Sequence, residues 1–133
     1  MIEIGVADGS SLLAWSEIFP NAHCVGMDIH HPHKGHGDRI EICIGDQRRK
    51  EDCERTANGR LFDFIVEDAT HKLENTLLTL LYLWPFVRPG GLYVVEEWDN
   101  IGALRHNVTG LWSNVKVFGA AHEPLVVFRK SYA

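Results

Sequence analysis

The sequence predicts an α/β protein with a doubly wound, mostly parallel sheet, formed as a single domain over residues 1–133. Short runs rich in β-branched residues alternate with helix-like runs, which is the usual pattern of parallel strands joined by helices on both faces of a sheet. The last two apolar runs break this alternation because only a few residues separate them. A parallel crossover needs about a dozen residues or more, so these runs predict an antiparallel hairpin at one edge.

Apolar runs bounded by glycine, proline and acidic residues mark the expected strands. Before the hairpin, these strands are residues 2–6, 23–29, 39–45, 61–67 and 92–97. The run at 61–67 is almost continuously apolar, as expected of a strand that is buried on both faces. The hairpin strands are expected within residues 114–120 and 124–130.

The segments between the strands predict helices at residues 10–19, 47–56 and 72–87, with a short helix within 99–113. Ser10 or Ser11 can cap the first of them, because a serine hydroxyl accepts a hydrogen bond from a free amide of the first turn. Pro85 is expected to mark or kink the last turn of the third helix. The glycine and proline content of residues 88–91 predicts a turn into the next strand.

The composition is that of an ordinary globular protein, with 45% hydrophobic and 23% charged residues. A formal net charge of −5 argues against a nucleic-acid-binding surface. No apolar stretch approaches the roughly 18 residues of a membrane helix, and the N-terminus lacks the pattern of a signal peptide. Cys24, Cys43 and Cys53 follow no CxxC spacing, which favours reduced core cysteines in a cytoplasmic protein.

A glycine-containing loop, with Glu3, Gly5 and Gly9, follows the first expected strand and leads into a helix. Glycine lets the backbone turn tightly and lets a ligand approach, while the helix N-terminus offers free amide donors. The dinucleotide fingerprint GxGxxG is absent, because Ala7 occupies the place of its middle glycine. The acidic side chains of Glu3 and Asp8 suit a cofactor with a positive centre better than one recognised through phosphate.

Acidic residues also end the next two strands. Asp28 follows the glycine loop by about twenty residues, the spacing at which an acid reaches the ribose hydroxyls of a nucleoside. Asp46 ends the third strand and is expected to face the base. Ligands of open α/β sheets bind outside the carboxyl ends of the strands, where both acids are expected. A plain strand-to-helix turn with solvated acids is the alternative explanation.

A second polar group follows the fourth and fifth strands. Asp68 ends the fourth strand, and Glu96 and Glu97 end the fifth, so neighbouring strand ends should bring these acids together. Clustered carboxylates repel one another unless a cation or protons intervene. An all-oxygen set suits Mg²⁺, or Mn²⁺ or Ca²⁺, better than zinc. His71 is placed to remove a proton from a hydroxyl near neutral pH.

The motifs EIGVADGSS, GMDIH, IGDQ, FDFIVEDATH and RPGGLYVVEE, with the terminal hairpin, resemble the class I S-adenosylmethionine-dependent methyltransferases over essentially the whole chain. Within that superfamily the sequence is most similar to the metal-dependent macrolide sugar O-methyltransferases of the demethylmacrocin and mycinamicin type and to cephalosporin-hydroxylase-like proteins. Their usual motifs DDGSH and VIED correspond here to EDATH and VEEW.

The resemblance implies a Rossmann-like fold and a divalent-metal-assisted O-methyltransferase that acts on a hydroxyl of a sugar or another small molecule. His71 matches the family's catalytic histidine, and Asp68, Glu96 and Glu97 match its metal ligands. Glu67 stands where the family usually has aspartate, and its role stays open at this stage. Contacts with S-adenosylmethionine are expected from Glu3, Gly5, Ala7, Gly9, Ser10, Asp28, Asp46 and Asp68.

Two other functions remain open. The first is a minimal S-adenosylmethionine- or nucleoside-binding module without turnover, because family members carry helices or a domain before the first strand, which begins here at residue 2. The second, a nicotinamide oxidoreductase, is disfavoured by Ala7 and the acidic loop. The histidine-rich loop at 30–36 is expected to close over the cofactor, and Trp98 to contact substrate. Exposed apolar helix faces favour a homodimer.

Overall fold

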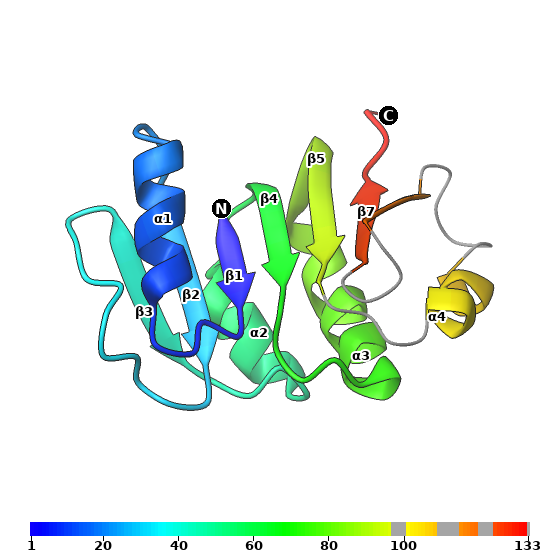
Figure 1. The fold of residues 1–133 in the computed structure, drawn as a ribbon, viewed down its shortest axis with the longest axis horizontal. Helices are drawn as coiled ribbons and strands as arrows, with labels where there is room; N and C mark the ends of the chain where they lie inside the picture. Colours follow the sequence, from blue (N-terminus) through cyan, green and yellow to red (C-terminus); the bar gives the residue numbers. More distant parts are fainter. Residues whose placement is uncertain (97–100, 109–114, 120–123, 133) are drawn as a thin grey trace.

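The computed structural model describes residues 1–96, 101–108, 115–119 and 124–132, with only the backbone at 101, 102 and 105. They form a seven-stranded sheet of order β3-β2-β1-β4-β5-β7-β6 (Figure 1). The pairs from β3 through to β5 are parallel, whereas β7 runs antiparallel to both β5 and β6. This arrangement confirms the predicted doubly wound sheet with a C-terminal antiparallel hairpin.

The elements agree with the predicted order. The strands are β1 (Ile2–Ile4), β2 (Cys24–Asp28), β3 (Ile40–Ile44), β4 (Phe62–Glu67), β5 (Val87–Val95), β6 (Val115–Phe118) and β7 (Leu125–Arg129). The helices are α1 (Ser10–Ile18), α2 (Lys50–Ala57), α3 (Leu73–Leu83) and α4 (Ile101–Val108), with a 3₁₀ turn, η1 (Trp84–Phe86). None of the helices in the described part of the chain has the length and apolar character needed to cross a bilayer.

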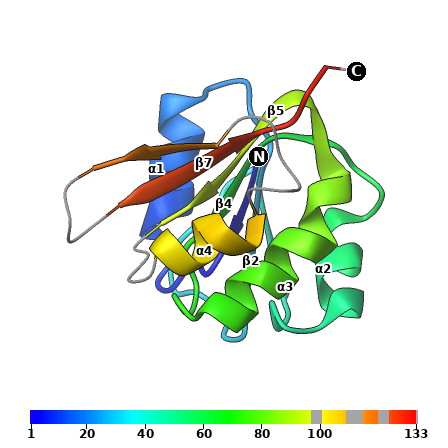
Figure 2. The same ribbon diagram turned by 90° about the vertical axis from the view of Figure 1, so that its right-hand side faces the viewer.

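Helices cover both faces of the sheet, with α1 on one side and α2 and α3 on the other (Figure 2). The larger apolar core lies under α2, α3 and α4 and includes the buried Cys53, Leu80 and Leu104. The smaller core lies under α1 and includes the buried Leu12 and Val66. Both faces of the central strands are therefore removed from water, as their nearly continuous apolar sequence requires.

A glycine at the centre of β2 brings α1 close to the sheet. A Cβ atom at Gly26 would lie 2.5 Å from Cδ1 of Leu12 and 2.9 Å from Cγ1 of Val6, distances at which atoms overlap. The missing side chain therefore lets the first turn of α1 rest directly on β2.

Two local predictions are wrong. The N-cap position of α1 is Gly9, in the left-handed conformation at φ 89°, rather than a serine. The hydroxyls of Ser10 and Ser11 donate instead to the carboxylates of Asp8 and Glu3, because a hydrogen bond to a charged carboxylate is stronger than one between neutral groups. Residues 88–91, expected as a turn, lie inside β5, where a register shift against β4 accommodates them.

Candidate active site

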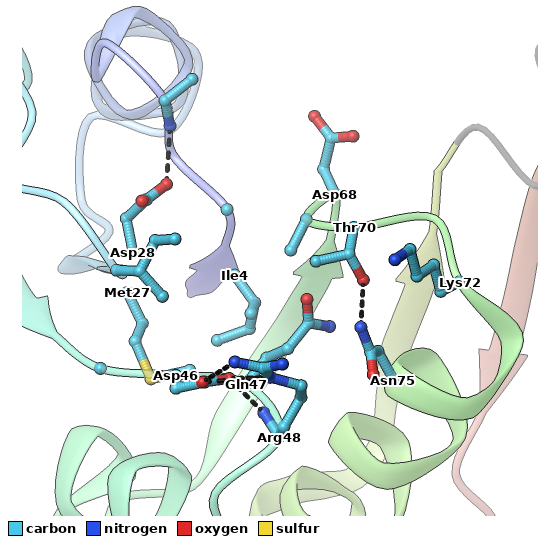
Figure 3. A pocket seen from close by; sticks show the side chains of 15 residues that line it. Ile4, Met27, Asp28, Asp46, Gln47, Arg48, Asp68, Thr70, Lys72 and Asn75 are labelled. Atoms are coloured by element: carbon cyan, nitrogen blue, oxygen red, sulfur yellow. Dashed lines mark hydrogen bonds and ion pairs between the residues drawn. The ribbon is translucent and has the colours of Figure 1, made fainter.

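A cavity of about 350 Å³ lies at the carboxyl ends of the central strands. These strand ends form the lower edge of the sheet in Figure 1. Its volume falls in the range of about 300 to 1,000 Å³ that is usual for small-molecule sites. The site is where the strand order reverses, because β2 and β4 flank β1 on opposite sides. Such switch points are the usual ligand sites of open α/β sheets. Most of its polar wall comes from Asp28, Asp46, Gln47, Arg48, Asp68, Thr70, Lys72 and Asn75 (Figure 3).

The glycine loop forms one wall of the cavity through Gly5 and Ala7. Gly5 has a φ of 84°, and a Cβ atom there would lie 2.5 Å from the carbonyl oxygen of Asp68. Ala7 also has a positive φ, 46°, although it carries a side chain. Asp28 holds this loop, since its Oδ2 accepts hydrogen bonds from the amides of Val6 and Ala7, both at 3.0 Å. The predicted loop and the predicted ribose-binding acid are thus in contact.

The histidine-rich loop packs against the outer side of the glycine loop. Lys34 donates its backbone N–H to the carbonyl oxygen of Asp8 at 2.8 Å, and its Nζ lies 2.8 Å from Oδ2 of Asp8. The hydrogen bond from Lys34 holds the pKa of Asp8 well below its usual range. Gly9 and Ser10 lie in this contact rather than on the cavity wall. Closure of the 30–36 loop over a cofactor stays a prediction.

Asp46 reaches the cavity wall, as expected from its place after β3, but it forms an ion pair there. Nη2 of Arg48 lies 2.6 Å from Oδ2 of Asp46, and Nε lies 2.9 Å from Oδ1 (Figure 3). The bonds from Arg48 lower the pKa of Asp46. A contact between Asp46 and a base stays a prediction.

Gln47 is a cavity residue that the sequence analysis missed. Its Nε2 donates to Oε1 of Glu67 at 2.8 Å and to Oγ1 of Thr79 at 2.9 Å, which fixes the orientation of the amide. Its Oε1 is buried and has no hydrogen-bond partner among the described residues. A buried acceptor of this kind favours a ligand with an N–H or O–H donor.

Glu67, whose role the sequence left open, lies beneath the cavity rather than in it. It is buried, with 1% of its surface exposed, and its Oε2 accepts a hydrogen bond from Oγ1 of Thr76 at 2.8 Å. Burial raises the pKa of Glu67, and its hydrogen bonds from Thr76 and Gln47 partly oppose that shift. The carboxylate therefore connects the end of β4 to α3 and to the loop after β3.

Asp68, His71 and Glu96 lie at the neighbouring ends of β4 and β5. Nε2 of His71 is 3.8 Å from Oδ1 of Asp68, and the Glu96 amide donates to the carbonyl oxygen of Glu67 at 3.0 Å. His71 has a φ of 53°, a left-handed conformation that is uncommon outside glycine. The residues that the structure describes contain no group of three or more His, Cys, Asp or Glu suited to a metal ion. Glu97 lies outside them, so the predicted ligand set stays a prediction.

Glu3 lies behind the glycine loop, on the α1 side of the sheet. Its side chain is buried, with 2% of the residue surface exposed, and Oγ of Ser11 donates a hydrogen bond to its Oε2 at 2.8 Å. Burial raises the pKa of Glu3 to about 7, and the nearby charges of Asp68 and Glu96 act in the same direction. Three of the predicted acids, Glu3, Asp68 and Glu96, therefore lie near enough for their charges to interact. Trp98, the predicted substrate contact, lies outside the described residues.

Two kinds of sequence comparison identify similar proteins. A family described as "Methyltransferase domain" matches residues 2–98. The chain is 36% identical over 107 residues to mycinamicin VI 2''-O-methyltransferase of Micromonospora griseorubida, a match that covers 73% of this chain and 26% of that protein. It is 33% identical over 106 residues to demethylmacrocin O-methyltransferase of Streptomyces fradiae, covering 73% of this chain and 27% of that protein. The chain thus spans about a quarter of the length of these relatives.

Solved structures show the same fold. The MycE methyltransferase from the mycinamycin biosynthetic pathway, in complex with Mg and SAH, superposes with a TM-score of 0.81 at 23% identity, over 98% of this chain and 45% of that one. A putative ribosomal RNA methyltransferase from Plasmodium falciparum gives a TM-score of 0.78 at 16% identity, over 99% and 86% of the two chains. These similarities confirm the predicted Rossmann-like architecture.

Proposed function

Since this chain belongs to the methyltransferase domain family, we propose that its cavity binds S-adenosylmethionine and that the domain transfers the methyl group to a hydroxyl of a sugar or another small molecule. The curated relatives named above are O-methyltransferases, and the MycE complex holds SAH and Mg. The observation that carries the proposal is the cavity at the strand reversal, which has a buried acceptor, Gln47, on its wall.

The cavity fits the adenosine part of this cofactor. Adenosine offers N–H donors on its base and O–H donors on its ribose. The cavity is lined by Asp28, whose carboxylate is an acceptor, and by Gln47, whose buried carbonyl oxygen has no described partner. Gly5 removes the Cβ that would obstruct the loop at Asp68. We assign the cofactor contacts to the residues expected from the sequence, with Glu3, Gly9 and Ser10 acting from behind the loop: Glu3, Gly5, Ala7, Gly9, Ser10, Asp28, Asp46 and Asp68.

The proposed chemistry takes place at the ends of β4 and β5. Asp68, Glu96 and Glu97 would hold a divalent cation, with Mg²⁺ as the first candidate, and a cation bound there lowers the pKa of a coordinated hydroxyl. His71 accepts the hydroxyl proton at Nε2. The acceptor oxygen forms a bond to the methyl carbon while the carbon–sulfur bond breaks, and its electron pair stays on sulfur to give S-adenosylhomocysteine.

Titration calorimetry with S-adenosylmethionine, with and without Mg²⁺, tests this function. We expect saturable cofactor binding with a Kd between about 1 μM and 1 mM, the usual span of substrate constants. Binding that is absent at millimolar cofactor would overturn the proposal. Transfer itself is then assayed with hydroxylated sugars as acceptors.

The proposed metal site is tested separately by two matched substitutions, one directly after β4 and one within it. Asp68→Asn is expected to weaken Mg²⁺ binding at least tenfold, about 1.4 kcal/mol, because it removes a proposed ligand charge. Asp63→Asn is the control, since the Asp63 side chain is 74% exposed and pairs with Arg88. Equal Mg²⁺ affinity in both variants would exclude this metal site and leave the cofactor site standing.

A further inference from the structure

The carboxylate of Glu67 joins three parts of the chain beneath the cavity. Its Oε2 accepts from Oγ1 of Thr76 on α3 at 2.8 Å, and its Oε1 accepts from Nε2 of Gln47, in the loop after β3, also at 2.8 Å. A third, longer contact of 3.4 Å comes from the backbone amide of Ala69. One side chain at the end of β4 therefore sets the positions of α3 and of both neighbouring loops.

The contacts continue through a chain of hydrogen-bonded polar groups, here called the frame, that runs from Glu67 to Asn75. Thr79 accepts from Nε2 of Gln47 at 2.9 Å and donates to the carbonyl oxygen of Asn75 at 2.8 Å. Gln47, Glu67, Thr76 and Thr79 are all nearly or fully buried. Away from water, such groups have no other partners to replace a lost bond, so the frame strongly favours one arrangement.

Both ends of this frame reach the loop formed by residues 68–71, which carries the proposed metal ligand and the proposed base. One end is Glu67 itself, which precedes Asp68 in the chain. The other is Asn75, whose Nδ2 donates to Oγ1 of Thr70 at 2.8 Å (Figure 3). Between them, His71 is held at a φ of 53°, a conformation that persists only where the surroundings enforce it.

We propose that Glu67 is a positioning residue, which fixes the 68–71 loop from below through its hydrogen bonds to Thr76 and Gln47. Resting on the proposed function, this assignment means that Glu67 places Asp68 and His71 for methyl transfer without touching substrate itself. The side-chain length matters, because an aspartate at this position would withdraw the carboxylate by about one carbon–carbon bond, roughly 1.5 Å. The extra methylene of Glu67 spans the distance to α3.

Opposite changes at position 76 separate hydrogen bonding from packing. Thr76→Val keeps the shape but removes the hydroxyl, whereas Thr76→Ser keeps the hydroxyl but removes a methyl group. Thr56→Val is the matched control, since Thr56 is an equally buried threonine on α2. The readouts are amide hydrogen exchange at residues 69–72, with the amides of α1 as an internal reference, and calorimetric affinity for S-adenosylhomocysteine with Mg²⁺ present.

We expect Thr76→Val to accelerate exchange at residues 69–72 at least tenfold relative to α1, and to weaken ligand affinity at least tenfold. Thr76→Ser and Thr56→Val should stay within about threefold of wild type in both. If Thr76→Ser is worse than Thr76→Val, or if exchange rises equally in α1, then position 76 supplies packing and the proposal is overturned. Should Thr76→Val fail to fold, Glu67→Asp gives the same test, because the shorter side chain withdraws the carboxylate from the Thr76 hydroxyl.

The exchange measurement also separates this proposal from the proposed function. A wild-type protein that binds no S-adenosylhomocysteine would contradict the function, but its loop exchange would still decide whether Glu67 and Thr76 fix residues 68–71. Normal ligand binding with unchanged loop exchange in Thr76→Val would overturn the positioning role alone.

Discussion

The carboxylate of Asp28 accepts a hydrogen bond from the backbone N–H of Ala7 at 3.0 Å, so the end of β2 holds the loop that follows β1. The same oxygen accepts from Val6, and the other carboxylate oxygen accepts from the amide of His30, each at 3.0 Å. A single side chain thus fixes the glycine loop and the beginning of the histidine-rich loop.

Replacing Asp28 by asparagine should uncouple these loops. Asparagine has one acceptor oxygen in place of two, so its NH₂ group must face either the His30 amide or the glycine loop and leave donors unpaired. We expect a loss of about 1 to 3 kcal/mol in the free energy of unfolding, together with at least tenfold weaker binding of S-adenosylhomocysteine. Denaturant unfolding and calorimetry measure the two effects. The control is Asp38→Asn, an exposed acid that follows the histidine-rich loop, and an equal loss there would contradict the assignment.

Gly9→Ala should disturb the contact between the glycine loop and the histidine-rich loop. Gly9 has a φ of 89°, and a Cβ atom there would overlap the carbonyl group of Lys34, 2.6 Å from its carbon. Gly59 has a comparable φ of 69° with nothing described within 4 Å. Both alanine variants carry the left-handed strain of about 1 to 2 kcal/mol, but only Gly9→Ala adds a clash. We expect it to lose at least about 1 kcal/mol more than Gly59→Ala in chemical unfolding. Equal losses of unfolding free energy in the two variants would show that the Lys34 carbonyl group moves aside without cost, which would contradict this prediction.

The buried Glu3 should make stability depend on pH. Its pKa of about 7 in the folded protein lies above the 4.5 of the unfolded chain, so folding takes up a proton between these values. Stability contributed by Glu3 is therefore complete below pH 4.5, falls as pH rises to 7, and is lost above it, by about 3 kcal/mol in total. Glu3→Gln mimics the protonated side chain and should gain stability relative to wild type across this window. Urea unfolding between pH 4.5 and 8 measures the difference, and parallel curves for the two proteins would contradict it.

The sequence predicts the sheet well because its signals are local. Apolar runs, glycines and prolines mark each strand, and the short spacing between the last two runs excludes a parallel crossover. These local signals do not predict the start of β5. Residues 88–91 have the composition of a turn, yet tertiary pairing with β4 absorbs them through a register shift. The position of Pro85, in η1 directly after α3, agrees with the expected end of that helix.

The residues of the candidate site also fall into two groups, those that the sequence predicts and those that it does not. Asp28, Asp46 and Asp68 could be found because acids directly after strands must gather at one edge of a parallel sheet. Gln47 and Thr76 could not, since each is an ordinary polar residue within its own segment and gains a role only when α3 packs against β4. Glu67 misleads for a related reason: a carboxylate in a strand is expected at the surface, whereas this one is buried among donors.

The absent side chain at Gly26 links the cavity to the packing of α1 on the sheet. Leu12 rests on Gly26 within the first turn of α1, and that turn is continuous with the glycine loop. A methyl group at position 26 would push Leu12 away from the sheet. The start of α1 and the glycine loop that precedes it would then shift outward together. The shape of the cavity thus depends in part on a residue at the centre of β2 that does not line it.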